Sequence, residues 1–138
     1  MVVLSLIEKN IRISRLSNLI SEKGLDYKCG EEGVNLSGGE KQRISITRCL
    51  LRETQILLID EATAALDNQI AFQIENDILS ISGLTRIIVT HKLEETLLDK
   101  YDEIVVLKEG QVEEKGTFKD LMELRGYFYS LYNVTKVV

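Results

Sequence analysis

Three short runs of consecutive apolar residues constrain the fold of this chain most strongly. They lie at residues 56–59 (ILLI), 87–89 (IIV) and 104–107 (IVVL). Short runs rich in Ile and Val predict strands, and a run without polar interruption is typical of a strand buried on both faces in a parallel sheet. Between the first two runs, Ile70, Ile74 and Ile78 fall four residues apart, which is the spacing of one helix face. This alternation of strand and helix predicts an α/β fold.

The rest of the chain is predicted to be mainly helical, with glycine-rich punctuation. An apolar helical pattern runs from Leu4 to Gly24, three glycines mark residues 24–35 as a loop, and a helix follows from about Gly38 to Leu51. Residues 92–99 also have a helical pattern. After the third apolar run, the sequence predicts a turn, a short partner strand at residues 111–114 and a capping box at residues 117–120.

Composition excludes several classes of function. Of the 138 residues, 44% are apolar and 28% are charged, which is ordinary for a globular domain. The net charge of -5 gives no long-range attraction to nucleic acid, so no nucleic-acid partner is expected. The two cysteines and single histidine do not form a zinc motif, and no apolar run approaches the roughly 20 residues that span a membrane.

A candidate phosphate site lies at residues 36–43, which read LSGGEKQR. Ser37 followed by Glu40 three positions later predicts a capping box at a helix start. Taken by itself, this pair would have only a structural role. Gly38 and Gly39 favour a further role, because they leave bare N–H groups at the positive end of the helix dipole. An anion could approach these N–H groups closely, with the Ser37 hydroxyl as an added donor.

Polar residues follow the first two predicted strands. Asp60 and Glu61 come directly after residues 56–59, and His91 comes two residues after the second run. Ligands bind at the carboxyl ends of strands in open α/β sheets. One carboxylate there can hold Mg²⁺ while its neighbour orients the water that attacks a phosphoryl group, and an imidazole can contact the phosphate.

The order of these elements resembles the ATP-binding cassette (ABC) family. Residues 36–43 resemble its signature motif, residues 56–60 its Walker B strand, and residues 65–67 (ALD) its D-loop, while Glu61 and His91 fall at its catalytic glutamate and switch histidine. The resemblance covers about residues 15–125. It implies a P-loop NTPase-like (RecA-like) parallel sheet portion, at about residues 53–138, preceded by a piece of the helical subdomain with the signature helix, at about residues 1–52.

The resemblance also implies cofactors, partners and roles. ATP and Mg²⁺ are the expected cofactors, and a second cassette, identical or different, is the expected partner, with transmembrane domains that hold the pair at the cytoplasmic face of a membrane. Asp60 is expected to hold the metal. The catalytic residues would be Glu61 and His91, and the nucleotide-binding residues would be Ser37, Gly38, Gly39, Glu40, Gln42 and Asp67. Residues 62–63 (AT) favour the exporter branch of the family.

Three departures from the family pattern qualify this interpretation. Glu40 stands where glutamine is commoner, and Ala64 replaces a usual serine. More seriously, the motif G-x-x-x-x-G-K-[ST] is absent, since Gly33 to Gly38 have the glycine spacing but Gly39 and Glu40 follow. The sequence therefore predicts the C-terminal portion of a cassette, inactive as an ATPase alone and with apolar sheet surface uncovered.

Two alternative functions remain open at this point. DNA-repair and chromosome-structure ATPases share a similar signature, Walker B strand, D-loop and histidine, although the first 35 residues lack their sustained coiled-coil heptads. The chain would otherwise be a non-catalytic remnant that binds a partner cassette.

Overall fold

The computed structural model describes residues 2–136 and forms two compact units, one ending at Val89 and the other beginning at Thr90. The predicted boundary between residues 52 and 53 lies inside the first unit and stays a prediction. The first unit contains α1 (Val2–Ile13), α2 (Ser17–Lys23), the 3₁₀ turn η1 (Glu31–Gly33), α3 (Gly38–Leu50), β1 (Ile56–Asp60), α4 (Asn68–Leu79) and β2 (Thr85–Val89). The second contains α5 (Glu95–Leu98), β3 (Ile104–Lys108), β4 (Gln111–Gly116), α6 (Phe118–Leu124) and α7 (Tyr127–Lys136).

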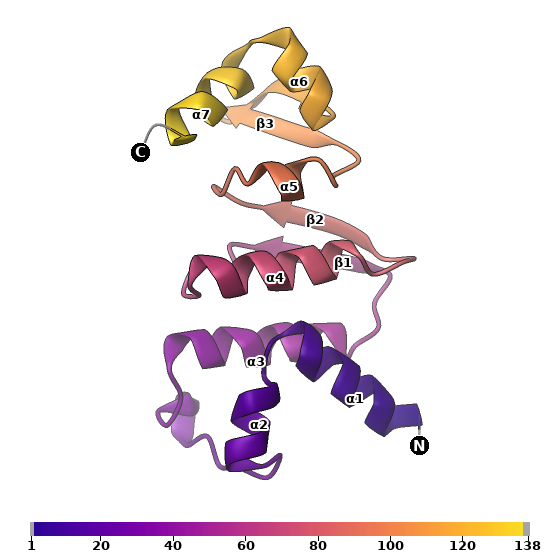
Figure 1. The fold of residues 1–138 in the computed structure, drawn as a ribbon, viewed down its shortest axis with the longest axis vertical. Coiled ribbons are helices and arrows are strands. Elements are labelled where there is room, and N and C mark those ends of the chain that lie inside the picture. The colour runs from indigo at the N-terminus through magenta and orange to yellow at the C-terminus, as the bar shows by residue number, and fades with distance from the viewer. Residues whose placement is uncertain (1, 137–138) are drawn as a thin grey trace. The chain divides into compact units, whose positions relative to one another are not determined.

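The first unit is built on two parallel strands joined by a crossover helix, which confirms the α/β class predicted from the sequence. The register of β1 and β2 runs from Ile56 opposite Thr85 to Asp60 opposite Val89. Between them the chain passes through α4, and the ribbon of Figure 1 shows that helix beside β1. Both strands therefore point the same way, and their carboxyl ends meet at one edge of the sheet.

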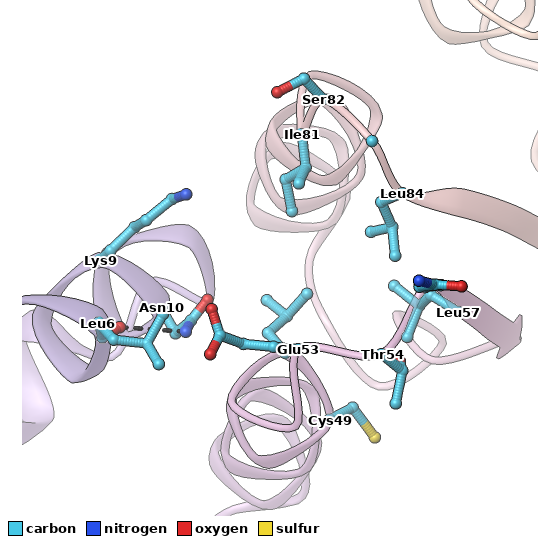
Figure 2. A pocket seen from close by; sticks show the side chains of 13 residues that line it. Leu6, Lys9, Asn10, Cys49, Glu53, Thr54, Leu57, Ile81, Ser82 and Leu84 are labelled. Atoms are coloured by element: carbon cyan, nitrogen blue, oxygen red, sulfur yellow. Dashed lines mark hydrogen bonds between the residues drawn. The ribbon is translucent and has the colours of Figure 1, made fainter. Parts of the chain in front are cut away.

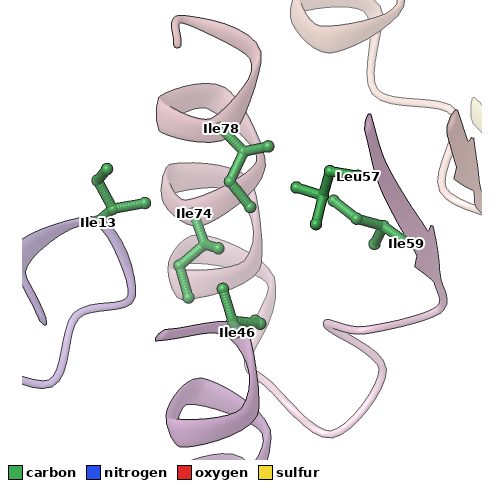
Figure 3. Packing of buried hydrophobic residues seen from close by; sticks show 6 residues of the cluster. All are labelled: Ile13, Ile46, Leu57, Ile59, Ile74 and Ile78. Atoms are coloured by element: carbon green, nitrogen blue, oxygen red, sulfur yellow. The ribbon is translucent and has the colours of Figure 1, made fainter. Parts of the chain in front are cut away.

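The core of the first unit lies between this sheet and the helices. Leu57 and Ile59 of β1 point toward Ile74 and Ile78 of α4, with Ile46 of α3 closing the cluster, as Figure 3 shows. Ile74 is fully buried. Removing a side chain of this size from water contributes about 1.5–3 kcal/mol to the stability of the folded chain. Because the isoleucines of α4 share one helix face, that face packs against the sheet.

The prediction that the first two strands are buried on both faces is wrong. Alternate residues of β1 and β2 face solvent, with exposed fractions of 62% for Ile56, 67% for Leu58, 55% for Ile87 and 48% for Val89. The physical reason is that α4 covers one face of the sheet, and none of the described residues 2–89 forms a layer on the other face. The expected uncovered apolar sheet surface is thereby confirmed.

Polar contacts fix the helices of the first unit to one another. The hydroxyl groups of Ser14 and Thr47 lie 2.5 Å apart and are buried, which joins the end of α1 to α3. Arg15 follows α1 with a positive φ of 56° and pairs with Asp77 of α4 at 2.8 Å. Its carbonyl accepts a hydrogen bond from Nη1 of Arg43 at 2.8 Å. The turn after α1 is therefore the common anchor of α1, α3 and α4.

The second unit is a hairpin covered by short helices. β3 and β4 pair antiparallel, with an irregularity between Val106 and Leu107. The core residues are Leu98, Val106, Leu121, Phe128 and Tyr132. The predicted capping box at Thr117 is confirmed, because its side chain accepts from the N–H of Asp120 while Asp120 accepts from the N–H of Thr117. Among the helices described between residues 2 and 136, none is long and apolar enough to span a membrane.

Candidate functional site

The start of α3 has the capping box that the sequence predicts. Ser37 Oγ accepts from the N–H of Glu40 at 3.2 Å, and Glu40 Oε2 accepts from the N–H of Ser37 at 2.7 Å. The Ser37 N–H and then its hydroxyl group hold the pKa of the Glu40 carboxyl below its ordinary value. The carboxylate thus turns back on its own helix instead of projecting from the helix end.

This cap leaves two donors at the helix start. The N–H groups of the cap residue and the first three helical residues have no partner within a helix. Here the box satisfies those of Ser37 and Glu40, so the N–H groups of Gly38 and Gly39 remain. Neither carries a side chain, and Gly38 is exposed. These two donors suit an anion at the positive end of the α3 dipole.

The first turn of α3 also packs against the loop that joins β1 to α4, at residues 61–67. Gln42 Oε1 accepts a hydrogen bond from the N–H of Ala65 at 3.0 Å. A Cβ placed on Gly39 would lie 3.1 Å from Leu66 Cδ2 and 3.4 Å from the Ala65 carbonyl oxygen. Sequence reasoning missed this contact, because nothing in the local pattern links two segments 23 residues apart.

The two predicted acids lie where β1 ends. Asp60 is the last residue of β1, and Glu61 follows it with a positive φ of 47°. The Glu61 N–H donates to the Val89 carbonyl at 3.2 Å, which ties the ends of β1 and β2 together. Both acidic residues are exposed. Glu61 thus leaves the strand in the left-handed backbone region directly after Asp60.

Asp67 is the N-cap of α4. Its Oδ1 accepts from the N–H of Ile70 at 3.0 Å. Sequence reasoning assigned Asp67 a nucleotide-binding role, and the sequence signal for its cap was present, since an Asp before an apolar helical pattern is a common helix start. The cap accounts for one carboxylate oxygen of Asp67, and its nucleotide-binding role stays a prediction.

His91 belongs to the second unit. It is exposed and directly follows Thr90, whose hydroxyl oxygen accepts from the N–H of Lys92 at 3.0 Å. The first unit brings the signature residues and the loop up to Asp67 together. His91 and Glu61 lie in different units, and their joint role at one site stays a prediction.

A cavity of about 280 Å³ in the first unit lies away from these residues. Figure 2 shows Leu6, Lys9 and Asn10 of α1 on one side, with Thr54 and Leu84 on the other. Thr54 and Leu84 precede β1 and β2, so the cavity borders the amino ends of the strands. The candidate acids lie at their carboxyl ends.

Asp60 and Glu61 offer some, but not all, of the ligands that a magnesium ion needs. Mg²⁺ prefers oxygen ligands and is commonly held by one or two carboxylates together with substrate phosphates. Asp60 offers an exposed carboxylate at the sheet edge. Within the described residues, no three side chains of His, Cys, Asp or Glu gather as a metal cluster. Asp60 therefore fits a metal that shares its coordination with a nucleotide.

A parallel sheet whose first strand ends in Asp60 and Glu61, together with a capped helix start that carries two glycines, defines an α/β protein with a candidate phosphate-binding edge. Comparisons with known proteins show which members of this broad class the chain is similar to. The sequence model of the ABC transporter family matches residues 5–64. The ATP-dependent lipid A-core flippase of Escherichia coli K12 is 42% identical over 132 residues, which cover 93% of this chain and 22% of the flippase. The flippase of Shigella flexneri gives the same values.

The structure of a bacterial Atm1-family ABC exporter with ATP bound matches the fold with a TM-score of 0.82 at 32% identity. That match covers 95% of this chain and 23% of the exporter chain. The chain is similar to ABC transporters, and among them to exporters. It spans about a fifth of the length of the flippases it matches.

Proposed function

We propose that the chain is part of the ATP-binding and ATP-hydrolysing module of an ABC exporter, which couples nucleotide hydrolysis to transport across a membrane. The observation that carries the proposal is the hydrogen bond from the Glu61 N–H to Val89, at the shared carboxyl edge of β1 and β2. It holds two carboxylates at the edge where α/β proteins bind ligands. The family relationship supplies the chemistry that suits them.

The acids have separate roles in this proposal. Asp60 holds Mg²⁺, which when bound neutralises charge on the phosphate oxygens. Glu61 accepts a hydrogen bond from the attacking water and orients it. His91 donates a hydrogen bond to the terminal phosphate. The change of backbone conformation at Glu61, directly after the last strand residue Asp60, supports separate roles for the two neighbours.

The start of α3 faces a different nucleotide. Ser37, Gly38 and Gly39 donate to the γ-phosphate of ATP that a partner cassette holds, as the resemblance of residues 36–43 to the family's signature motif implies. Glu40 keeps the helix start in shape, and Asp67 couples the two sites across the interface. The partners are a second cassette and transmembrane domains, and the location is the cytoplasmic face of a membrane.

The uncovered sheet face favours one alternative, a non-catalytic piece that binds a partner cassette. Leu58, with 67% of its surface exposed, lies at the centre of that face. The DNA-repair alternative has no corresponding support, since the relatives described above are transporters.

A chimaera tests the proposal. This chain replaces the 132-residue matching segment of the E. coli flippase, and ATP turnover is measured with saturating Mg²⁺. A group that activates the attacking water contributes about 10²–10⁴-fold, so Glu61→Gln should lower kcat by about 10²-fold or more. Glu123→Gln, on the exposed surface of α6, is the matched control and should leave kcat unchanged. Equal turnover in the Glu61→Gln and parent chimaeras contradicts the proposal.

A further inference from the structure

Within the segment of residues 36–43, the side chain of Gln42 contacts a neighbouring loop, whereas Gly38 and Gly39 offer N–H groups at the helix start. Gln42 lies one turn into α3, and its side chain is half-buried. Its Oε1 accepts a hydrogen bond from the N–H of Ala65 at 3.0 Å. The amide oxygen of Gln42 is thus directed at the loop of residues 61–67, and the donors suited to phosphate lie at Gly38 and Gly39.

Close packing supports the same attachment. A Cβ on Gly39 would be 3.1 Å from Leu66 Cδ2, which is tighter than ordinary contact. A Cβ on Gly38 would lie 3.9 Å from Ala65 Cβ. Leu66 in turn packs against the core cluster of the first unit. The first turn of α3 is therefore seated on the loop, and glycine at position 39 permits the close approach.

Further hydrogen bonds connect the loop of residues 61–67 internally and to α4. The N–H of Ala64 donates to the Glu61 carbonyl at 3.0 Å, and the N–H of Leu66 donates to the Thr63 carbonyl at 3.1 Å. Thr63 Oγ1 donates to Glu75 Oε1 of α4 at 2.5 Å. These bonds link the residues of the loop to one another, so a displacement of the α3 start at Gln42 would be passed to both ends of the loop.

We propose that Gln42 is a positioning residue that ties the start of α3 to the loop carrying Glu61 and Asp67. It acts through the Ala65 N–H and does not touch the nucleotide. A phosphate drawn to Gly38 and Gly39 would then shift the loop with the helix. The functional consequence rests on the proposed function, whereas the contact itself is a property of this chain.

The contact is tested by hydrogen exchange of the Ala65 amide, measured by NMR on the full 138-residue chain. Gln42→Met keeps the length but removes the strong acceptor, and Gln42→Glu keeps an acceptor oxygen. A net hydrogen bond of ordinary strength predicts that exchange at Ala65 accelerates about threefold to tenfold in Gln42→Met. Gln42→Glu should stay near the parent rate. The Thr85 amide, which donates to the Gln55 carbonyl at the amino ends of β1 and β2, is the internal reference.

An unchanged Ala65 rate in Gln42→Met, or an equal acceleration in Gln42→Glu, overturns the proposal. If exchange of the Thr85 amide also accelerates in Gln42→Met, the variant has unfolded the first unit, and Gln42→Ala is measured in its place under the same criteria. Gln111→Met, on the exposed surface of β4, is the matched control.

The functional part is tested in the flippase chimaera. Gln42→Met should lower kcat about threefold to tenfold with KM unchanged, and Gln42→Glu should restore kcat. Equal kcat values in the parent and Gln42→Met chimaeras overturn the coupling. If Glu61→Gln leaves turnover intact, the proposed function fails, while the Ala65 exchange result still decides whether Gln42 holds the loop.

Discussion

Thr63 donates a hydrogen bond to Glu75 across a buried contact of 2.5 Å between Thr63 Oγ1 and Glu75 Oε1. Each residue has an exposed fraction of 5%. Thr63 lies two residues after Glu61, and Glu75 lies on the face of α4 that also carries Ile74 and Ile78. This contact anchors the loop beyond the candidate catalytic acid to the core helix of the first unit.

Replacing Thr63 with valine should destabilise the chain. Thr63→Val keeps the shape but removes a donor to a buried carboxylate, which is expected to lower the free energy of unfolding by about 1–3 kcal/mol. Thr63→Ser keeps the hydroxyl group and should lose less. Urea unfolding followed by circular dichroism measures both. An equal loss in the two variants would show that the methyl group, and not the hydrogen bond, is what matters.

A charge on the uncovered sheet face should reduce self-association. Ile56 and Leu58 of β1 and Ile87 of β2 expose more than half of their surfaces. Exposed apolar patches of this kind favour aggregation. Leu58→Lys should shift the chain toward the monomer in analytical ultracentrifugation, whereas Leu57→Lys, at a buried position of the same strand, should unfold it. Self-association unaffected by Leu58→Lys would locate the contact elsewhere.

Acid should weaken the capped start of α3. The N–H of Ser37, followed by its hydroxyl group, holds the pKa of Glu40 below its ordinary value of 4.5. Because the folded-state pKa is the lower one, the contribution to stability is present above pH 4.5 and is lost as the pH falls through the folded-state pKa.

Glu40→Gln removes this titration, and a Gln side chain can still accept the Ser37 N–H. The difference in urea midpoint between pH 7 and pH 3 should therefore be smaller in Glu40→Gln than in the parent. Glu123→Gln is the control. The pKa values of Glu95 and Asp120 are lowered as well, by contacts with Tyr132 and Thr117, so part of the pH dependence should persist. An unchanged pH dependence in Glu40→Gln contradicts the assignment.

Glu114 should make position 126 intolerant of a side chain. Its carboxylate oxygens accept from the N–H groups of Tyr127 at 2.6 Å and Phe128 at 2.9 Å, at the start of α7. A Cβ on Gly126 would overlap Glu114 Oε1. Gly126→Ala should lower the free energy of unfolding by about 1–3 kcal/mol. In a Glu114→Ala background the same change should have a smaller effect, and equal effects in a double-mutant cycle would contradict the steric account.

Local features of this chain were predictable from the sequence. The capping boxes at Ser37 and Thr117 were predicted because their partners lie three residues away. The ends of β1 and α3 were also predicted closely, and Asp60 and Glu61 lie at the carboxyl end of β1 as expected. In each case hydrophobic periodicity and cap chemistry within a short window are sufficient.

Features that depend on packing were not predictable. The continuous run at residues 56–59 suggested burial on both faces, yet Leu58 is exposed, because periodicity does not reveal which layers cover a sheet. The hydrogen bond between Gln42 and Ala65 joins residues 23 positions apart, and that between Thr63 and Glu75 joins residues 12 apart. Such pairs are set by how helices meet loops, which a single sequence does not encode as a pattern.

In the proposed division of labour, this chain supplies the acids and a glycine-lined helix start, and residues outside it hold the triphosphate. The most direct test is Mg²⁺-dependent ATP turnover by the purified 138-residue chain, measured for the parent and for Glu61→Gln. We expect no turnover above background in either. Turnover that requires Mg²⁺ and is lost in Glu61→Gln would contradict the account, because the chain would then hold and hydrolyse its own nucleotide.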